Sequence, residues 1–146
     1  MCWTTFIRPH IQTATENIPV YKIVTKEGGF WFWSTFQSYY QNFIYKLHKI
    51  YSEKIGKICS EEANFYSINK GIHSYHNAFT KISVGKHGEI WIGGLNGDII
   101  GYYFQSAYRN VVKVQGYIPK GSKYYLNEYG EYVSEQIVLT KYNKIK

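Results

Sequence analysis

The feature that most constrains the fold is a segment near the end of the chain, Val111 to Leu139. Two runs rich in β-branched residues, Val111–Ile118 and Tyr132–Leu139, flank a polar connection that contains one proline and two glycines. β-Branched residues favour extended strands, and proline and glycine favour turns. The pattern predicts a strand, a turn and a second strand, so an antiparallel sheet is expected at the centre of the fold.

Other strands are predicted from alternation and from turn residues. Ile18–Thr25 alternates apolar and polar positions and is followed by a KEGG turn. Glu89–Ile92 and Asp98–Phe104 flank the connection GGLNG, which is the clearest hairpin signal in the chain. Gly71–Thr80 predicts a short strand that runs into a helical turn, and Phe43–Tyr51 is predicted to be extended.

Helix is expected only in short pieces. Ser60–Phe65 predicts one helical turn, because a serine followed by two glutamates is typical of a helix N-terminus. Cys2–Asn17 lacks periodicity and is expected to be irregular. No repeat or linker divides the chain, so residues 1–146 are expected to form a single domain. The predicted fold class is α+β, a compact and mostly antiparallel sheet with few short helices.

The charge balance favours phosphate-bearing partners. Seventeen lysines and arginines against ten acidic residues give a net charge of +7, which attracts anions over long range. Only Arg8 and Arg109 are arginines, and bidentate arginine contacts are the commonest specific contacts to duplex DNA. A nucleotide-type small molecule is therefore the expected partner, and double-stranded DNA is not.

No membrane partner is expected. The apolar run Phe30–Phe36 is shorter than a membrane span, and Cys2–Gln12 contains arginine, proline and histidine where a signal peptide needs apolar residues. A cytoplasmic location is predicted, which for a viral protein is the host cytoplasm. Cys2 and Cys59 lack the spacing of metal sites, so neither a metal nor a cofactor is expected. The sequence leaves the oligomeric state open, including a homo-oligomer.

Cations and aromatic residues meet in the connection between the two closing strands. Backbone amides around Gly121 and the hydroxyl of Ser122 predict an anion-binding nest, to which Lys120 and Lys123 add charge. Tyr124 or Tyr125 is predicted to stack on a planar group such as a base. The alternative is a solvated turn whose tyrosines pack back on the sheet.

The densest polar cluster is His73, Ser74, Tyr75 and His76. In an extended segment, His73 and Tyr75 face one side while Ser74 and His76 face the other. A histidine that titrates near neutral pH can act as a general acid or base, so His73 is a predicted catalytic residue. Ser74 and Tyr75 are predicted ligand contacts. The alternative is a histidine that hydrogen-bonds the backbone at the end of a strand.

Cys2 is a second predicted catalytic residue. Removal of Met1 leaves a cysteine whose α-amine, with a pKa of about 7.7–8.0, lies beside its thiol. N-terminal nucleophile hydrolases use this arrangement. The alternative is a buried cysteine beside Trp3.

Four consecutive aromatic residues, Phe30–Trp33, cannot all face inward from one strand, because successive side chains alternate between faces. Either both faces are covered or two rings are exposed. Exposed rings at Trp31 or Trp33 predict a stacking platform or a patch that binds another protein.

Several motifs form a recognisable set: the Met1-Cys2 start, Val20-Tyr21-Lys22, QNFIYKLHKIY, GIHSY, IPKGSKYY and YVSEQIVL. Together they resemble a loosely defined family of small uncharacterised proteins from bacteriophages and their bacterial hosts. The resemblance covers most of the chain apart from Gly85–Tyr103. It implies a viral or mobile-element origin and brings no established chemistry.

A second set of motifs has a recognisable layout: Tyr21-Lys22 on a first strand, a Gly-x-x-Ser pattern at Gly71–Ser74, and an IPKG turn before a strand that carries a glutamate. This layout is similar to that of ADP-ribosyltransferase folds, and the resemblance implies activity on NAD. The E-x-E or Q-x-E signature of that family is incomplete, since Glu135 is followed by glutamine and isoleucine.

These elements combine in one hypothesis. The Lys120–Tyr125 turn, the strand of Tyr21 and Lys22, and the strand of His73–Tyr75 are predicted to form three walls of one pocket, so Tyr21 and Lys22 are predicted ligand contacts. The pocket is expected to bind a nucleotide-type ligand, such as a signalling nucleotide of host immunity, in an anti-defence role. Whether it also cleaves that ligand is left open. The alternatives are an ADP-ribosyltransferase-like enzyme acting on NAD and a non-enzymatic inhibitor that binds a host protein.

Overall fold

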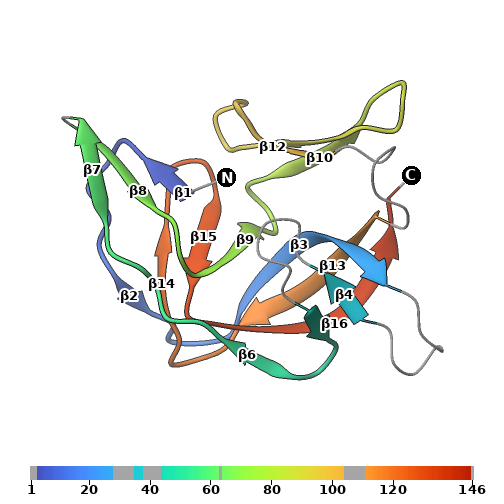
Figure 1. Ribbon diagram of the computed structural model, residues 1–146, viewed down its shortest axis with the longest axis horizontal. Helices are drawn as coiled ribbons and strands as arrows, with labels where there is room; N and C mark the ends of the chain where they lie inside the picture. Colours follow the sequence, from blue (N-terminus) through green and yellow to red (C-terminus); the bar gives the residue numbers. More distant parts are fainter. Residues whose placement is uncertain (1–2, 28–34, 38–43, 63, 104–110, 146) are drawn as a thin grey trace.

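The computed structural model describes residues 3–27, 35–37, 44–62, 64–103 and 111–145, and within these ranges it contains sixteen strands and no helix. The strands are β1 (Trp3–Thr5), β2 (Gln12–Thr13), β3 (Ile18–Glu27), β4 (Thr35–Gln37), β5 (Ile44–Lys46), β6 (Ile50–Ser52), β7 (Cys59–Glu62), β8 (Phe65–Ile68), β9 (Ile72–His76), β10 (Lys81–Val84), β11 (Ile90–Gly93), β12 (Ile99–Tyr103), β13 (Val111–Ile118), β14 (Lys123–Leu126), β15 (Glu131–Ser134) and β16 (Gln136–Lys144). They form one large sheet and two smaller ones (Figure 1).

The predicted α+β class is wrong, because the part of the chain that the structure describes is all β. The helical turn predicted at Ser60–Phe65 is instead the antiparallel pair of β7 and β8. β8 also pairs with β1 and buries Ile68 against Trp3. One helical turn is only marginally stable by itself, so pairing and burial outweigh the local helix signal.

The predicted strands are largely confirmed. Val111–Ile118 is β13 with the same bounds, and Ile18–Thr25 lies within β3. The predicted hairpin around GGLNG is the antiparallel pair β11–β12. Gly71–Thr80 contains β9 followed by a turn, and Phe43–Tyr51 contains β5 and most of β6. The N-terminal stretch that was expected to be irregular carries the short strands β1 and β2.

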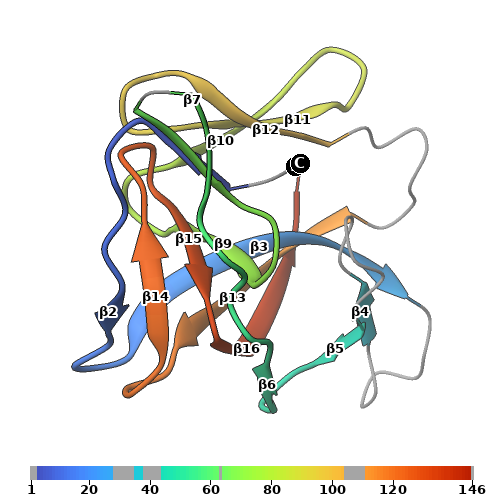
Figure 2. The same cartoon turned by 60° about the vertical axis from the view of Figure 1, so that its left-hand side comes forward.

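The large sheet is antiparallel and runs in the order β2-β14-β15-β9-β3-β13-β16-β6, with β4 paired to β3 and β5 paired to β4. The two smaller sheets are β1-β8-β7 and β10-β11-β12. Figure 2 shows the large sheet turning through a strong curve, with β14 and β15 nearly upright and β3 and β13 crossing below the β10-β11-β12 sheet.

The closing segment is more elaborate than the predicted strand, turn and strand. Its connection contains β14, which pairs with β15, so the second run is divided at Glu135 between β15 and β16. β16 then pairs with β13. The amide of Glu135 donates a hydrogen bond to the carbonyl of Lys123 at 2.9 Å. This bond ties the start of β16 to the start of β14 and holds the curved sheet together at one end.

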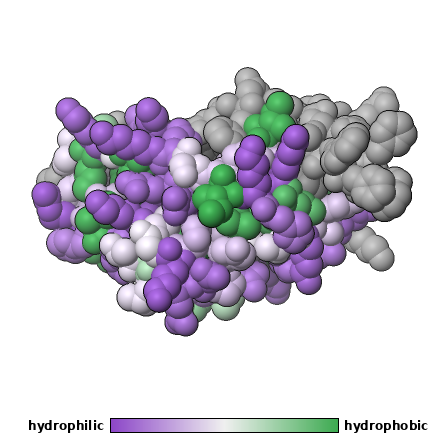
Figure 3. Space-filling view, turned by 90° about the horizontal axis from the view of Figure 1, so that it is seen from below, coloured by the Kyte–Doolittle hydropathy of each residue, from purple (hydrophilic) through white to green (hydrophobic). Residues whose placement is uncertain are grey.

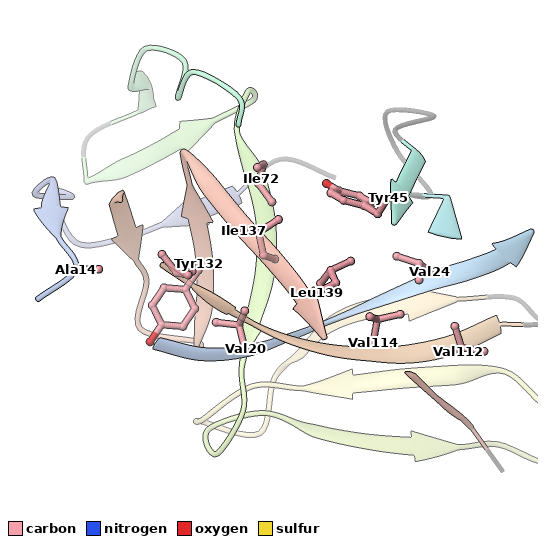
Figure 4. Close-up of a cluster of buried hydrophobic side chains, with 11 residues drawn as sticks. Ala14, Val20, Val24, Tyr45, Ile72, Val112, Val114, Tyr132, Ile137 and Leu139 are labelled. Atoms are coloured by element: carbon pink, nitrogen blue, oxygen red, sulfur yellow. The ribbon is translucent and has the colours of Figure 1, made fainter. Parts of the chain in front are cut away.

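Side chains on the two faces of the large sheet pack into separate clusters. The concave face carries the cluster shown in Figure 4: Ala14, Val20, Val24, Tyr45, Ile72, Val112, Val114, Ile118, Tyr132, Ile137 and Leu139. The outer face packs on the β10-β11-β12 sheet through Tyr21, Ile23, Tyr75, Ile90, Ile92, Ile100, Tyr103 and Val111. A third cluster joins β15 to the β1-β8-β7 sheet through Trp3, Ile68 and Val133.

The turn between β14 and β15 holds the N-terminal strand in place. Four hydrogen bonds connect them: Asn127 Nδ2 to Thr4 O (2.8 Å), Trp3 Nε1 to Glu131 O (2.8 Å), and Thr5 Oγ1 and Phe6 N to Glu128 Oε2 (3.1 and 3.2 Å). Asn127 also shapes the turn itself, because its Oδ1 accepts from the amides of Tyr129 and Glu131. Its side chain is buried, and the hydrogen bonds that it makes itself are partly buried.

Asn127→Ala is expected to lower the free energy of unfolding by about 2 kcal/mol, because it leaves a partly buried carbonyl and two partly buried amides without their partner. Urea unfolding of the two proteins measures the difference. Asn69→Ala is the matched control, since Asn69 is exposed, and a change within about 0.5 kcal/mol is expected there. Equal effects of the two substitutions would show that the Asn127 bonds do not hold the N-terminal strand.

Candidate functional site

Two of the three predicted pocket walls meet at the pairing of β3 with β9. Tyr21 lies opposite Tyr75 and Val20 opposite His76, and Lys22 and Ser74 are the next residues of the two strands, at the point where this pairing ends. The ladder itself ends at Tyr21, and the ammonium of Lys22 donates instead to the carbonyl of His73. Lys22 thereby satisfies a backbone acceptor that the separating strands leave open.

Lys22 and Ser74 are a polar pair in an otherwise largely apolar row on the concave face. The row consists of Leu126, Tyr132 and Ser74, which are paired across β14, β15 and β9, and of Lys22, Val114 and Tyr142, which are paired across β3, β13 and β16. Lys22 is 8% exposed and Ser74 is 2% exposed. Ser74 Oγ is buried and has no hydrogen-bond partner among the residues that the structure describes. A buried hydroxyl without a partner costs free energy unless something binds it.

Burial lowers the pKa of Lys22 to about 8, and Glu53 opposes this shift only in part. The ammonium is therefore mostly protonated at neutral pH in a place where water solvates it poorly, and an anion placed beside it would be strongly favoured. The ring centroid of Tyr45 lies 5.6 Å from Lys22 Nζ, within the range of a cation–π contact.

Tyrosine rings border the Lys22–Ser74 pair. Tyr45 reaches from β5 over the concave cluster (Figure 4), and its ring packs edge-on against Tyr51 at 5.0 Å. Tyr132 lies directly across from Ser74. Burial raises the pKa of Tyr45 above its usual value and that of Tyr132 to about 12, so both rings stay uncharged. The site thus combines one cation, one unpaired hydroxyl and flat aromatic faces.

Tyr21 and Tyr75 are brought together by the structure, but on the other face of the sheet. The hydroxyl of Tyr21 is 2.5 Å from Thr80 Oγ1, and that of Tyr75 is 2.7 Å from the hydroxyl of Tyr103. The two rings are 5.4 Å apart inside the cluster between the sheets. These tyrosines build the core that supports β3 and β9 and do not line the Lys22–Ser74 site.

His73 also projects from the outer face, as strand alternation predicts. It lies across from Val133, and its Nε2 is buried without a hydrogen-bond partner among the described residues. Burial, with the nearby charge of Lys22, lowers the pKa of His73 to about 4. The imidazole is therefore neutral at physiological pH, and a sheet separates it from the Ser74 hydroxyl.

The backbone of the Lys120–Tyr125 turn is engaged within the protein. Its amides donate as follows: Lys120 N to Asn17 Oδ1 (3.0 Å), Gly121 N to Ala14 O (2.8 Å) and Ser122 N to Pro119 O (3.0 Å). Ser122 is buried, and its hydroxyl accepts from Gln136 N and donates to Lys123 O. These bonds use the donors that the predicted anion nest requires, and they make the turn a structural junction between β2, β14 and β16.

Tyr124 and Tyr125 point to opposite faces of β14. Tyr124 packs edge-on against Tyr132 at 5.7 Å and donates its hydroxyl proton to Gln12 Oε1 at 2.9 Å. Tyr125 packs on Trp3 at 6.0 Å in the third cluster. Only Tyr124 therefore belongs to the concave face, where Tyr132 separates it from Ser74.

Protonation of His73 and of Glu131 is expected to act on stability in opposite directions. The pKa of His73 is about 4 in the folded protein instead of 6.5, so the contribution of His73 to the free energy of unfolding is lost as pH falls below 6.5. Burial raises the pKa of Glu131 from 4.5 to about 7, so the contribution of Glu131 to the free energy of unfolding is lost as pH rises above 4.5. Between pH 4.5 and 6.5 the two contributions largely cancel.

Glu131→Gln removes one of these opposing groups. Its free energy of unfolding is expected to fall, relative to the native protein, by roughly 2 kcal/mol between pH 6.5 and pH 4.5. Denaturant unfolding at a series of pH values measures the profile, and Glu16→Gln, at an exposed position, is the control. Profiles that run parallel for Glu131→Gln and the native protein would contradict the burial of Glu131.

Two predicted features lie outside the described residues, namely Cys2 and the aromatic run Phe30–Trp33. Sequence reasoning missed Tyr45 and Glu53, which lie within or beside a stretch with both helical and strand periodicity. Within the described ranges, no cluster of three or more metal-binding side chains occurs, and no helix is long and apolar enough to cross a membrane. Comparisons of the chain with protein-family models, with curated proteins and with solved structures found no match.

Proposed function

We propose that the protein binds a nucleotide-type ligand at the Lys22–Ser74 pair on the concave face of its large sheet. The observation that carries this proposal is a buried ammonium beside a buried hydroxyl that has no partner among the described residues. The Lys22 ammonium contacts the carbonyl of His73, the residue next to Ser74, so one phosphate group could accept hydrogen bonds from both side chains. The positive charge of the whole chain would attract such a ligand.

In this proposal the phosphate accepts hydrogen bonds from Lys22 Nζ and Ser74 Oγ. A phosphate accepts several hydrogen bonds at once, and those from an ammonium are the strongest type. The base would then stack on a tyrosine ring of the same face, with Tyr45 and Tyr51 the nearest candidates on the β5–β6 segment. Binding would place an anion beside the poorly solvated lysine charge, and this attraction would supply the affinity.

The ligand would enter where β5 and β6 cover the concave face. Each of these strands pairs over only three residues with its neighbour. Ile44 and Ile50 are 56% and 59% exposed, so much of the apolar surface of this segment stays in contact with water and does not stabilise the fold. Figure 3 shows the underside of the molecule, where small groups of apolar side chains stand in a mainly hydrophilic surface. Short, sparsely packed edge strands open at a lower free energy than the core.

The geometry favours capture of the ligand over its cleavage at this site. His73 is on the opposite face from Ser74, so it cannot transfer a proton to a group held between Lys22 and Ser74. Together with the resemblance to phage proteins, this supports sequestration of a signalling nucleotide of host immunity as the biological role that we propose.

Thermal unfolding with a panel of nucleotides tests the proposed function. The panel contains ADP, ATP, cyclic mono- and dinucleotides, NAD and inorganic phosphate, and at least one nucleotide is expected to raise the melting temperature by several degrees. Ser74→Ala should reduce the shift, whereas Lys141→Met, at an exposed position, should not. Chromatography of the same mixtures should return intact ligand, and hydrolysis of NAD would favour the transferase alternative. The absence of a shift with any member would overturn the proposal.

A further inference from the structure

The turn that joins β9 to β10 is fastened by the side chain of His76. This histidine is the last residue of β9, and its Nδ1 accepts hydrogen bonds from the amides of Ala78 (3.0 Å) and Phe79 (3.1 Å). The ring of Phe79 stacks on the imidazole, with ring centroids 3.7 Å apart and an interplanar angle of 6°. In Figure 1 the chain passes through this turn from the large sheet to the β10-β11-β12 sheet. His76 therefore fixes a connection between the two sheets.

The same turn reaches the core between the sheets through Thr80. Thr80 Oγ1 donates to the carbonyl of His76 at 2.9 Å. The hydroxyl of Tyr21 lies 2.5 Å from Thr80 Oγ1 and is the donor of that pair, because the proton of Thr80 is already used. Tyr21 is 1% exposed. The hydrogen bond of a buried tyrosine hydroxyl thus depends on the conformation of the turn.

The two amide bonds require a neutral imidazole. A neutral histidine accepts with one ring nitrogen and carries its proton on the other, so the proton of His76 is on Nε2. An imidazolium has donors at both nitrogens and no acceptor, so a proton on Nδ1 would face the amides of Ala78 and Phe79 donor to donor. His76 is only partly buried, and a proton can reach it from solvent. Burial lowers the pKa of its imidazole below the usual value.

The elements packed against His76 place no charged side chain against its ring within the described residues. Val20 of β3 and Tyr132 of β15 lie next to it on the concave face, and burial keeps Tyr132 uncharged. Lys22 lies two residues farther along β3, where its ammonium donates to His73 O. The other titratable side chains of these strands and of the turn lie on the outer face or in solvent, namely Tyr21, His73, Tyr75, Glu131 and Lys81.

We propose that His76 is an acid-sensitive latch on the β9–β10 turn. In its neutral form Nδ1 holds the amides of Ala78 and Phe79. When the ring takes up a proton from solvent, both bonds are lost, the turn opens, and Thr80 no longer holds the hydroxyl of Tyr21. The attachment of the β10-β11-β12 sheet to the large sheet then loosens at this connection. The latch needs no ligand, so it is independent of the function proposed for Lys22 and Ser74.

NMR spectroscopy of the native protein between about pH 7.5 and 4.5 tests this inference. The backbone amide resonances of Ala78 and Phe79 should shift with the same midpoint as the ring of His76, and this midpoint should lie below about pH 6.5, the usual pKa of histidine. Across it, the protection of both amides against hydrogen exchange, relative to the unfolded-chain rate at the same pH, should fall by about 2- to 10-fold. This is the range expected for the loss of a hydrogen bond.

Two variants separate the proton from the hydrogen bonds. His76→Asn does not titrate in this range, and an asparagine at the end of an extended segment accepts from the amides two and three residues later. The turn should stay closed in this variant, and the pH dependence of the two amides should disappear. His76→Phe keeps a ring for Phe79 to stack on but has no acceptor, so the protection should be low at every pH.

His10→Asn, at an exposed position, is the control and should leave the behaviour of Ala78 and Phe79 as in the native protein. The inference is overturned if these amides do not follow the titration of His76 in the native protein. It is equally overturned if their pH dependence persists in His76→Asn, or if His76→Phe keeps the protection that the native protein shows at neutral pH.

Discussion

Gly116→Ala is expected to lower the free energy of unfolding by about 3 kcal/mol and the melting temperature by roughly 10 °C. A β-carbon at this position would lie 2.0 Å from the carbonyl oxygen of Val138 and 2.9 Å from the α-carbon of Leu139. Both are backbone atoms of β16, which cannot move aside as the end of a side chain can. The substitution therefore forces β13 and β16 apart.

The position of Gly116 explains why this contact matters for the whole fold. The register between β13 and β16 shifts between Gln115 and Gly116, where β16 carries Thr140 as an extra residue. Thr140 Oγ1 donates to Gln115 O at 3.2 Å. Such bulges increase the bend of a strand, and this one lies in the sheet whose curvature creates the concave face.

Denaturant unfolding measures the effect of Gly116→Ala, and Gly93→Ala is the matched control. Gly93 is also within a strand, but the nearest atom to its added β-carbon would be 3.8 Å away, which is an ordinary contact. A change within about 0.5 kcal/mol is expected for the control. Equal destabilisation by both substitutions would mean that the cost arises from alanine in a strand and not from the close approach of β16.

Lys22→Met is expected to abolish the melting shift that nucleotides produce, while leaving the protein folded. Losing a hydrogen-bonded charge at a desolvated anion site weakens binding by about 30-fold or more. The fold tolerates methionine because the change removes a buried charge as well as the bond to His73 O, and these two effects act in opposite directions. Lys141→Met again serves as the exposed control.

The same substitution should remove a specific dependence of stability on pH. The pKa of Lys22 is about 8 in the folded chain and near 10.5 in the unfolded chain. Above pH 8 the folded protein releases a proton that the unfolded chain retains, so the free energy of unfolding rises with pH. Between pH 8 and 9.5 the expected gain is roughly 1–2 kcal/mol for the native protein, and it should be absent from Lys22→Met. Indistinguishable profiles would show that Lys22 is exposed to water.

Local pattern was sufficient to predict many of the strands but not the fold class. Val111–Ile118 and the hairpin around GGLNG carry their own turn and strand signals, and both are found where they were predicted. Ser60–Phe65 carries a helix-start signal of comparable strength, but its segment pairs with a strand more than fifty residues earlier in the chain. Nothing within six residues encodes that pairing, so the local signal was misleading.

The candidate site was likewise predictable from local sequence pattern only in part. Alternation along β9 correctly placed His73 and Ser74 on opposite faces, and that placement alone separates the predicted catalytic histidine from the Lys22–Ser74 pair. The contact between Lys22 and β9 joins strands about fifty residues apart, and it depends on how the whole sheet curves. The contribution of Tyr45 depends on the same curvature, because β5 reaches the concave face through its pairing with β4 and through the hydrogen bond from His48 N to Leu139 O.

The central claim is that Lys22 is a buried cation that binds a phosphate-bearing ligand. Titration of Lys22 Nζ by NMR, through its ε-carbon resonance, tests this most directly when performed with and without the panel nucleotide that gives the largest melting shift. The free protein should show a pKa of about 8 for Lys22, and saturation with the nucleotide should raise it, because the anion stabilises the ammonium. A free pKa near 10.5, or a value that saturating nucleotide leaves unchanged, would contradict the claim.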